Sequence, residues 1–419
     1  MSAHSPSPPR SPFHGWVPAL VTVAGSLAAM GVVAALGLWA AGAAGLPEGA
    51  FGPVLAAVLV LAVGGTVRLS GDAGDLAGAE GGLTVIPLSV TLTGALVLGW
   101  CFLRPLRRRT AVGAPGPAGW AARVAVLWLP AVLGLALAAR RTFEVPLGDD
   151  LLGDLGELFG VRPVAGFAAD VLPTVLTGLV WLAGVLVVAL LVSRGAPLPP
   201  ELARFRAGAR PAARAVVGLL LASVAVALVV ALVAAAARGR PAETFAVILL
   251  GLPNVAWPAL TIGLGATWEG RVEGPFGLPM PRVLDEVLRT PDVSELNLGS
   301  LVEHDGGRWW WLLVAAAVLV AGAACFMAAA SPAGVPPWQH AVRLAVALAL
   351  AVLTIGSTAR VSARIGLSVL GIGDLGEGLS GQVLLEPRLW GASGLALLWG
   401  LVAGFAGAWA VRGAGRRKR

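Results

Sequence analysis

A chain of 419 residues is long enough for two or three soluble domains, but its composition excludes that class. Hydrophobic residues make up 57% and charged residues 13% of it, whereas an average soluble domain has about half and about a quarter. With a mean hydropathy of +0.83, the chain is predicted to be a multi-pass integral membrane protein. The net charge of +7 indicates no nucleic-acid partner, because the arginines flank apolar runs, where they act as topology signals.

Several kinds of catalytic site are absent from the sequence. The only lysine is Lys418, in the C-terminal tail, so neither a phosphate-binding loop with its lysine nor a Schiff-base lysine is available. The four histidines are scattered, without the spacing of a zinc site: His4, His14, His304 and His340. Cys101 and Cys325 lie in apolar runs and are interpreted as small hydrophobic residues. We therefore expect no enzyme activity, cofactor or metal.

Ten uncharged stretches follow a Pro- and Ser-rich N-terminal segment, 1–15, that is predicted to be disordered. They cover 16–44, 50–67, 83–103, 124–139, 171–193, 215–237, 244–267, 309–330, 344–359 and 389–411. Most approach the roughly 20 residues that a helix needs to cross about 30 Å of hydrocarbon. The sequence thus predicts an all-α polytopic helix bundle.

The distribution of charge favours eight crossings over ten. If 50–67 and 244–267 enter the membrane and return to the same side, one side of the membrane carries 17 of the 30 basic residues and a single acid, Glu201. Since basic loops face the cytoplasm, both termini are predicted to be cytoplasmic in the cell membrane. The alternative is that both segments are ordinary kinked spans, in which case ten crossings leave no charge asymmetry.

Sequence matches between distant segments predict an internal duplication. Arg123, Arg140 and the segment Gly153–Glu157 recur 220 residues later as Arg343, Arg360 and Gly373–Glu377. Further upstream, Pro47 and Phe51 match Pro241 and Phe245 at an offset of 194. The two parallel repeats are 16–193 (the first half) and 194–411 (the second half), followed by a basic cytoplasmic tail, 412–419.

The repeated Gly-Asp-Leu-Gly-Glu motifs supply the main candidate site. If the halves are symmetric, Asp154, Glu157, Asp374 and Glu377 occupy equivalent outer positions and form a carboxylate cluster for a cation. The alternatives are a solvated turn, a helix start, or pairing with Arg140 and Arg360.

Asn254, in the stretch 244–267, is the candidate intramembrane polar residue. Its alternative role is to cap backbone where the helix breaks.

The longer outer loop of the second half, 268–308, is a candidate surface for an extracytoplasmic protein partner. It holds eight acids, and 281–289 is predicted to form a short amphipathic helix. That helix is interpreted as a lid on the outer surface or as a contact for the partner.

Three segments resemble the streptophobe family: Ala34–Gly42, Gly64–Gly74 and Ile86–Leu92. The resemblance implies a very hydrophobic membrane protein of Streptomyces and related actinobacteria, with no assigned biochemical role and no site residues to transfer. The expected function is a non-catalytic membrane component or partner-binding scaffold in the lipid bilayer. The alternative is a permease for a small or amphipathic solute.

Overall fold

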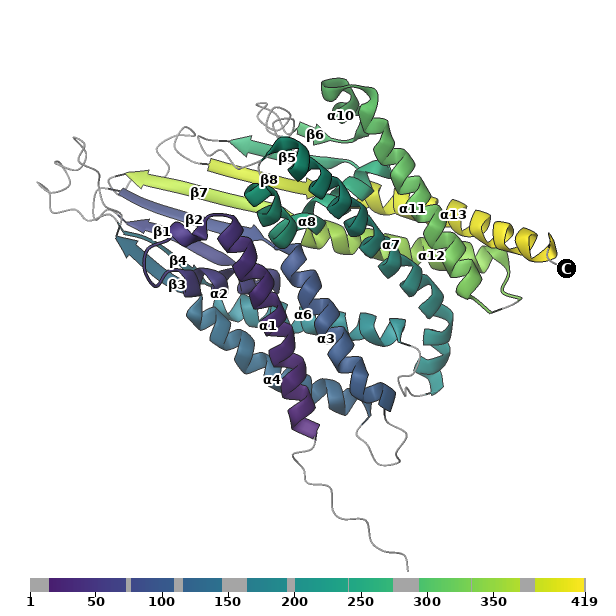
Figure 1. The fold of residues 1–419 in the computed structure, drawn as a ribbon, viewed down its shortest axis with the longest axis horizontal. Helices are drawn as coiled ribbons and strands as arrows, with labels where there is room; N and C mark the ends of the chain where they lie inside the picture. Colours follow the sequence, from purple (N-terminus) through teal and green to yellow (C-terminus); the bar gives the residue numbers. More distant parts are fainter. Residues whose placement is uncertain are drawn as a thin grey trace, which may run out of the picture.

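The computed structural model describes residues 15–72, 77–108, 116–144, 164–193, 200–239, 241–273, 294–332, 334–369 and 381–417. Within these ranges nine helices are long and apolar enough to cross a membrane. They are α1 (Trp16–Ala40), α3 (Leu88–Arg108), α4 (Pro117–Ala138), α6 (Val171–Val192), α7 (Pro200–Arg238), α8 (Pro241–Gly263), α11 (Trp310–Ala330), α12 (Pro337–Thr358) and α13 (Leu389–Arg417). The predicted all-α polytopic bundle is confirmed (Figure 1).

Shorter helices lie in the connections. Helix α2 (Phe51–Ala62) is apolar but has only 12 residues, which is about 18 Å of helix and too short to span the hydrocarbon. The short helix η2 (Ala43–Gly45) precedes it, and α10 (Leu298–Asp305) and η3 (Gly307–Trp309) lead into α11.

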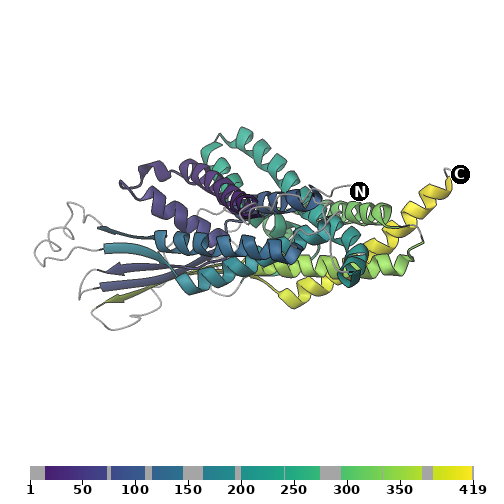
Figure 2. The same ribbon diagram turned by 90° about the horizontal axis from the view of Figure 1, so that it is seen from below.

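An eight-stranded antiparallel sheet projects from one end of the bundle (Figures 1 and 2). Its strands are β1 (Val67–Asp72), β2 (Ala77–Val85), β3 (Arg140–Glu144), β4 (Val164–Ala169), β5 (Trp268–Glu273), β6 (Ser294–Leu296), β7 (Val361–Val369) and β8 (Gly381–Pro387). The strands lie mostly between the uncharged stretches of the sequence, and the sheet is not among the predicted elements.

The strands alternate apolar and polar side chains, which gives the sheet two different faces. In β7, valine, alanine, isoleucine and leucine alternate with serine, arginine and glycine. The register continues the pattern across strands, because Val67 lies opposite Leu83 and Ala169, while Arg68 lies opposite Gly82 and Ala168. The apolar face packs against α2 through Val67 and Ala169, and the polar face, which carries Arg68, is exposed.

The two halves of the chain contribute the same succession of elements. Each has a helix, an apolar helical segment (α2 or α8), a hairpin, two long helices, a second hairpin and a final helix. The sheet order is β3-β4-β1-β2-β7-β8-β5-β6, in which the second four strands repeat the arrangement of the first four.

The chain connections constrain how α2 and α8 lie relative to the sheet. Because all eight strands belong to one sheet, they lie on the same side of any membrane that the bundle crosses. Helix α7 runs toward the sheet, and α8 follows it and leads into β5 (Figure 1). Both ends of α8 therefore lie at the sheet end, and the same holds for α2 between α1 and β1.

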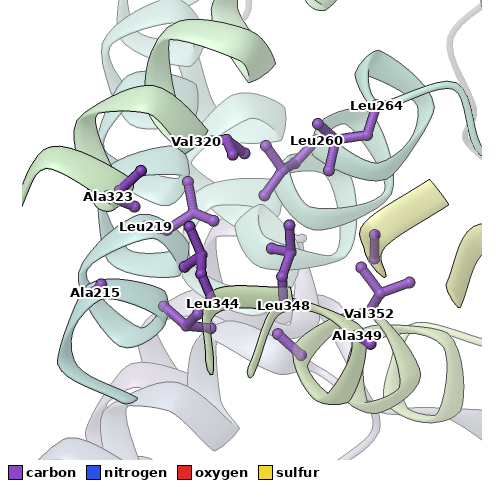
Figure 3. Packing of buried hydrophobic residues seen from close by; sticks show 14 of the residues in the cluster. Ala215, Leu219, Leu260, Leu264, Val320, Ala323, Leu344, Leu348, Ala349 and Val352 are labelled. Carbon is purple, nitrogen blue, oxygen red and sulfur yellow. The ribbon is translucent and has the colours of Figure 1, made fainter. Parts of the chain in front are cut away.

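Each half has its own apolar core. In the first half, Met30, Phe102, Trp120 and Trp128 are fully or almost fully buried among α1, α3, α4 and α6. In the second half, leucine, alanine and valine side chains of α7, α8, α11 and α12 point toward one another (Figure 3). Close packing of α13 on α12 requires small residues, since a Cβ at Gly400 would lie 2.3 Å from the Cα of Ala345.

Candidate functional site

Helix α8 is broken within the bundle of apolar helices. Gly251 has non-helical backbone angles (φ −140°, ψ 19°), and Pro253 and Pro258 lie just beyond it. In an unbroken helix the Leu252 N–H would donate to the Ile248 carbonyl. Instead, the Ser89 hydroxyl of α3 accepts from the Leu252 N–H (3.0 Å) and donates to the Ile248 oxygen (2.8 Å). A hydroxyl from the first half is thus inserted into the broken helix of the second half, a recognised cause of a kink.

Asn254 completes this junction between the halves. Its Nδ2 donates to the Ile86 carbonyl (2.8 Å), and its Oδ1 accepts from the Leu88 N–H (2.9 Å). Leu88 begins α3, and the first N–H groups of a helix have no partner within it. The side chain that was singled out as an intramembrane polar candidate therefore caps the start of another helix. Both of its polar atoms are engaged by backbone.

The start of α3 also contacts α2 and α1. The Thr91 hydroxyl donates to the Ala62 carbonyl (2.7 Å) at the end of α2, and the buried Ser26 hydroxyl of α1 donates to the Gly94 carbonyl (3.0 Å). Gly37 of α1 allows α8 to approach, because a Cβ there would lie 2.6 Å from Leu250 side-chain atoms. The hydroxyl groups of Thr91 and Ser26 are thus hydrogen-bonded to backbone carbonyls where these helices meet.

Ion pairs lie on the polar face of the sheet, next to the helices. Arg68 Nη2 is 2.6 Å from Asp170 Oδ1, and the Thr66 hydroxyl donates to Asp170 Oδ2 (3.0 Å). In the second half Arg388 bonds to Glu269 and lies 2.6 Å from Glu295. The hydrogen bond to Glu269, followed by the charge of Glu295, raises the pKa of Arg388.

The backbone shows that these two ion-pair sites occupy corresponding positions. The Asp170 N–H donates to the Thr66 carbonyl (3.1 Å), and the Arg388 N–H donates to the Thr267 carbonyl (3.0 Å). Gly64 and Gly265, at the ends of α2 and α8, both have positive φ (87° and 96°), which glycine adopts without strain. Arg68 therefore corresponds to Glu269, and Asp170 corresponds to Arg388.

The predicted match of 47 and 51 with 241 and 245, at an offset of 194, concerns the start of the two helical segments. The hydrogen bonds at the ends of α2 and α8 relate positions 201 residues apart, such as Thr66 and Thr267. A larger offset at the ends requires additional residues within the second segment, and α8 has 23 residues where α2 has 12. The match at the start of the segments stays a prediction.

The predicted carboxylate cluster lies outside the described residues. Asp154 and Glu157 fall between β3 and β4, and Asp374 and Glu377 fall between β7 and β8. The two hairpins that flank them are four strand positions apart in the sheet, which is about 19 Å at the usual strand spacing. The predicted amphipathic helix 281–289 also lies outside the described residues. Contacts among the described residues do not test the shared cation site.

The other predicted residues at the sheet are Arg140 and Arg360. Arg140 begins β3 and lies opposite Ala168 in the register, and Arg360 directly precedes β7. Both are exposed. Whether they pair with the carboxylates stays a prediction.

Ser89 and the sheet are the features that sequence reasoning missed. The signal for the sheet was the alternation in segments such as 361–369, a period of two that is typical of a half-buried strand. Ser89 carried only a weak signal, as a hydroxyl residue just after Pro87. No family model, curated protein or solved structure matches the chain.

Proposed function

We propose that the chain is a non-catalytic membrane component whose sheet binds a protein partner outside the membrane. The observation that carries this proposal is the exposed polar face of the sheet, to which both halves of the chain contribute. Side chains on that face include Arg68, Ser70, Thr84 and Arg364, all of which are exposed. The partner surface predicted at 268–308 contributes β5 and β6 at one edge of the same sheet.

The junction between the halves supports a scaffold more than a permease. A transport path needs polar groups that are available to a solute. The polar side chains at this junction, Ser89 and Asn254, are engaged by backbone groups. The described core of the second half is leucine, alanine, valine and methionine. A permease for a small or amphipathic solute remains the alternative function.

The proposed topology has eight crossings, with the sheet outside the cell. Helices α2 and α8 enter and leave on the sheet side, although α8 is long enough to span. Support comes from the position of α8 between α7 and β5 and from the basic residues at the opposite ends of the helices. Basic residues on that side include Arg104, Arg123, Arg204, Arg206, Arg210, Arg214, Arg343 and Arg412.

The proposal includes the internal duplication and the resemblance to the streptophobe family. The repeated strand order and the paired hydrogen bonds at Thr66 and Thr267 support duplication. Two of the segments that carry the resemblance, 34–42 and 86–92, lie at the contact of α8 with α1 and α3. This places them where the two halves meet.

Site-specific photocrosslinking in cells tests the proposed function. A photoreactive amino acid at Ser70 or Thr84, on the polar face, is expected to give discrete crosslinks to one protein. The same residue at Leu202, which is exposed on α7 at the opposite end of the bundle, is the matched control. Deleting the gene and profiling exported and retained metabolites separates the alternatives. A specific metabolite that accumulates on one side, without crosslinks from the sheet, would favour the permease.

A further inference from the structure

A groove of about 590 Å³ lies between α12 and α13. Ala341 and Ala406 contribute small side chains to its lining, and Trp338 and Phe405 contribute large ones. Every lining side chain is apolar, and those of Trp338 and Phe405 are 61% and 52% exposed. Because both helices are candidate membrane spans, this groove opens toward lipid rather than toward water.

An arginine lies beyond the end of the groove that is remote from the sheet. Arg412 follows Phe405 by seven residues, which is two turns, so both are on the same face of α13. Its Nη2 donates to the Val335 carbonyl (2.5 Å), just before α12 begins. Arg412 is exposed, and within the described part of the chain no ion pair involves it.

Two tryptophans mark the depth of this arginine in the membrane. Trp338 is at the start of α12, and Trp409 is 74% exposed, one turn before Arg412. Indole rings prefer the level of the lipid headgroups. A guanidinium at that level lies next to phosphate groups, which it binds with paired N–H donors.

We propose that this groove binds an anionic phospholipid, with one acyl chain between α12 and α13 and the phosphate on Arg412. The apolar lining fits a hydrocarbon chain, and Arg412, which has no acidic partner among the described residues, fits an anionic headgroup at one end. Basic sites between membrane helices bind anionic headgroups in this way. The inference concerns a lipid partner and is independent of the proposed role of the sheet.

Native mass spectrometry of the full chain in detergent tests this inference. Phosphatidylglycerol and phosphatidylcholine with identical acyl chains are added in turn, and the retained lipid is measured. We expect the wild type to retain more phosphatidylglycerol than phosphatidylcholine. Arg412→Gln should lower retention of phosphatidylglycerol by about fivefold, the effect of one basic residue near the membrane surface, and leave phosphatidylcholine unchanged. Arg204→Gln removes an exposed arginine of α7 on the same side of the bundle and should change neither.

A second variant tests the groove itself. Ala406 is exposed, so Ala406→Leu fills the groove without disturbing the core and should lower retention of both lipids. Equal retention of the two lipids by the wild type, or full retention of phosphatidylglycerol by Arg412→Gln, would overturn the proposal. The proposal would also be overturned if the wild type forms a dimer that Ala406→Leu dissociates. In that case a second copy of the chain, and not a lipid, would cover the groove.

Discussion

Arg68 pairs with Asp170 across β1 and the start of α6, with 2.6 Å between Nη2 and Oδ1. The corresponding pair of the second half has its charges exchanged: Glu269 stands in place of the arginine, and Arg388 stands in place of the aspartate. The same backbone hydrogen bond holds both sites, from the residue before a helix to a threonine carbonyl. We infer that the backbone sets the geometry and that either order of charges is compatible with it.

Exchanging the charges of Arg68 and Asp170 should therefore be tolerated. Arg68→Glu alone places two carboxylates together and is expected to lower the free energy of unfolding by less than about 1 kcal/mol, because the Arg68 side chain is 72% exposed. The double variant Arg68→Glu with Asp170→Arg should recover much of that loss. Thermal unfolding in detergent at low and high salt measures both effects, and high salt should reduce them.

Arg364 provides the control for this exchange. It lies on the same face of the sheet, opposite Gly82, and is exposed, so Arg364→Glu should change stability little. A double variant no more stable than the worse of its two single variants would contradict the interpretation.

The hydroxyl of Ser89 is predicted to stabilise the break in α8. Ser89→Ala leaves the Leu252 N–H and the Ile248 oxygen without the partner that bridges them, at a cost of about 1–3 kcal/mol. The unfolding temperature in detergent measures this loss. Thr93→Ala is the control, because among the described residues the Thr93 hydroxyl bonds only to the carbonyl of Ser89 in its own helix. Equal unfolding temperatures for the wild type and Ser89→Ala would mean that α8 closes the gap by itself.

Two substitutions separate the two hydrogen bonds of Asn254. Asn254→Asp retains an acceptor for the Leu88 N–H but loses the donor to the Ile86 carbonyl. Asn254→Leu loses both bonds and should destabilise the protein more, by about 1–3 kcal/mol per unsatisfied buried group. The unfolding temperatures of the two variants show which substitution destabilises the protein more. If Asn254→Asp is the less stable variant, the cost of placing a charge at this half-buried position outweighs the retained hydrogen bond to the Leu88 N–H.

Hydropathy predicted the helix bundle because a membrane span leaves a strong signal in sequence. Hydropathy does not reveal the sheet, because its strands are shorter than a membrane span. Their alternation of apolar and polar residues is also interrupted by glycines, such as Gly81 and Gly82 of β2. Charge sorting predicts that α8 does not cross the membrane as its neighbours do. Helix α8 is nevertheless long and apolar enough to span, so this stays a prediction.

The candidate site was only partly predictable. One of the two roles predicted for Asn254 is to cap backbone at the break in its own helix, whereas its side chain bonds to backbone at the start of α3. Its partners Ile86 and Leu88 lie more than 160 residues away in sequence, a distance that no local pattern reveals. The carboxylates at 154, 157, 374 and 377 remain a prediction, since they lie outside the described residues.

Close packing of α13 on α12 should depend on Gly400. Gly400→Ala places a Cβ 2.3 Å from the Cα of Ala345, and such overpacking typically costs about 1–3 kcal/mol. Gly394→Ala on the same helix meets nothing within 4 Å and should be neutral or slightly stabilising, because alanine favours a helix. Unfolding temperatures of the two variants measure the difference, and a similar loss for both would point to a general effect of substitutions in α13.

The proposed topology makes a prediction about the start of α8. Single cysteines are introduced at exposed positions in a background with Cys101→Ser and Cys325→Ser: Thr84→Cys on the sheet, Ala242→Cys in the first turn of α8 and Leu202→Cys on α7. A membrane-impermeant maleimide applied to intact cells should label the first two and not the third. If α8 crossed in place of α7, Ala242 would lie on the side opposite the sheet, because α8 would then separate it from β5. Labelling of Ala242→Cys only after the membrane is opened, with Thr84→Cys labelled from outside, would show that α8 crosses.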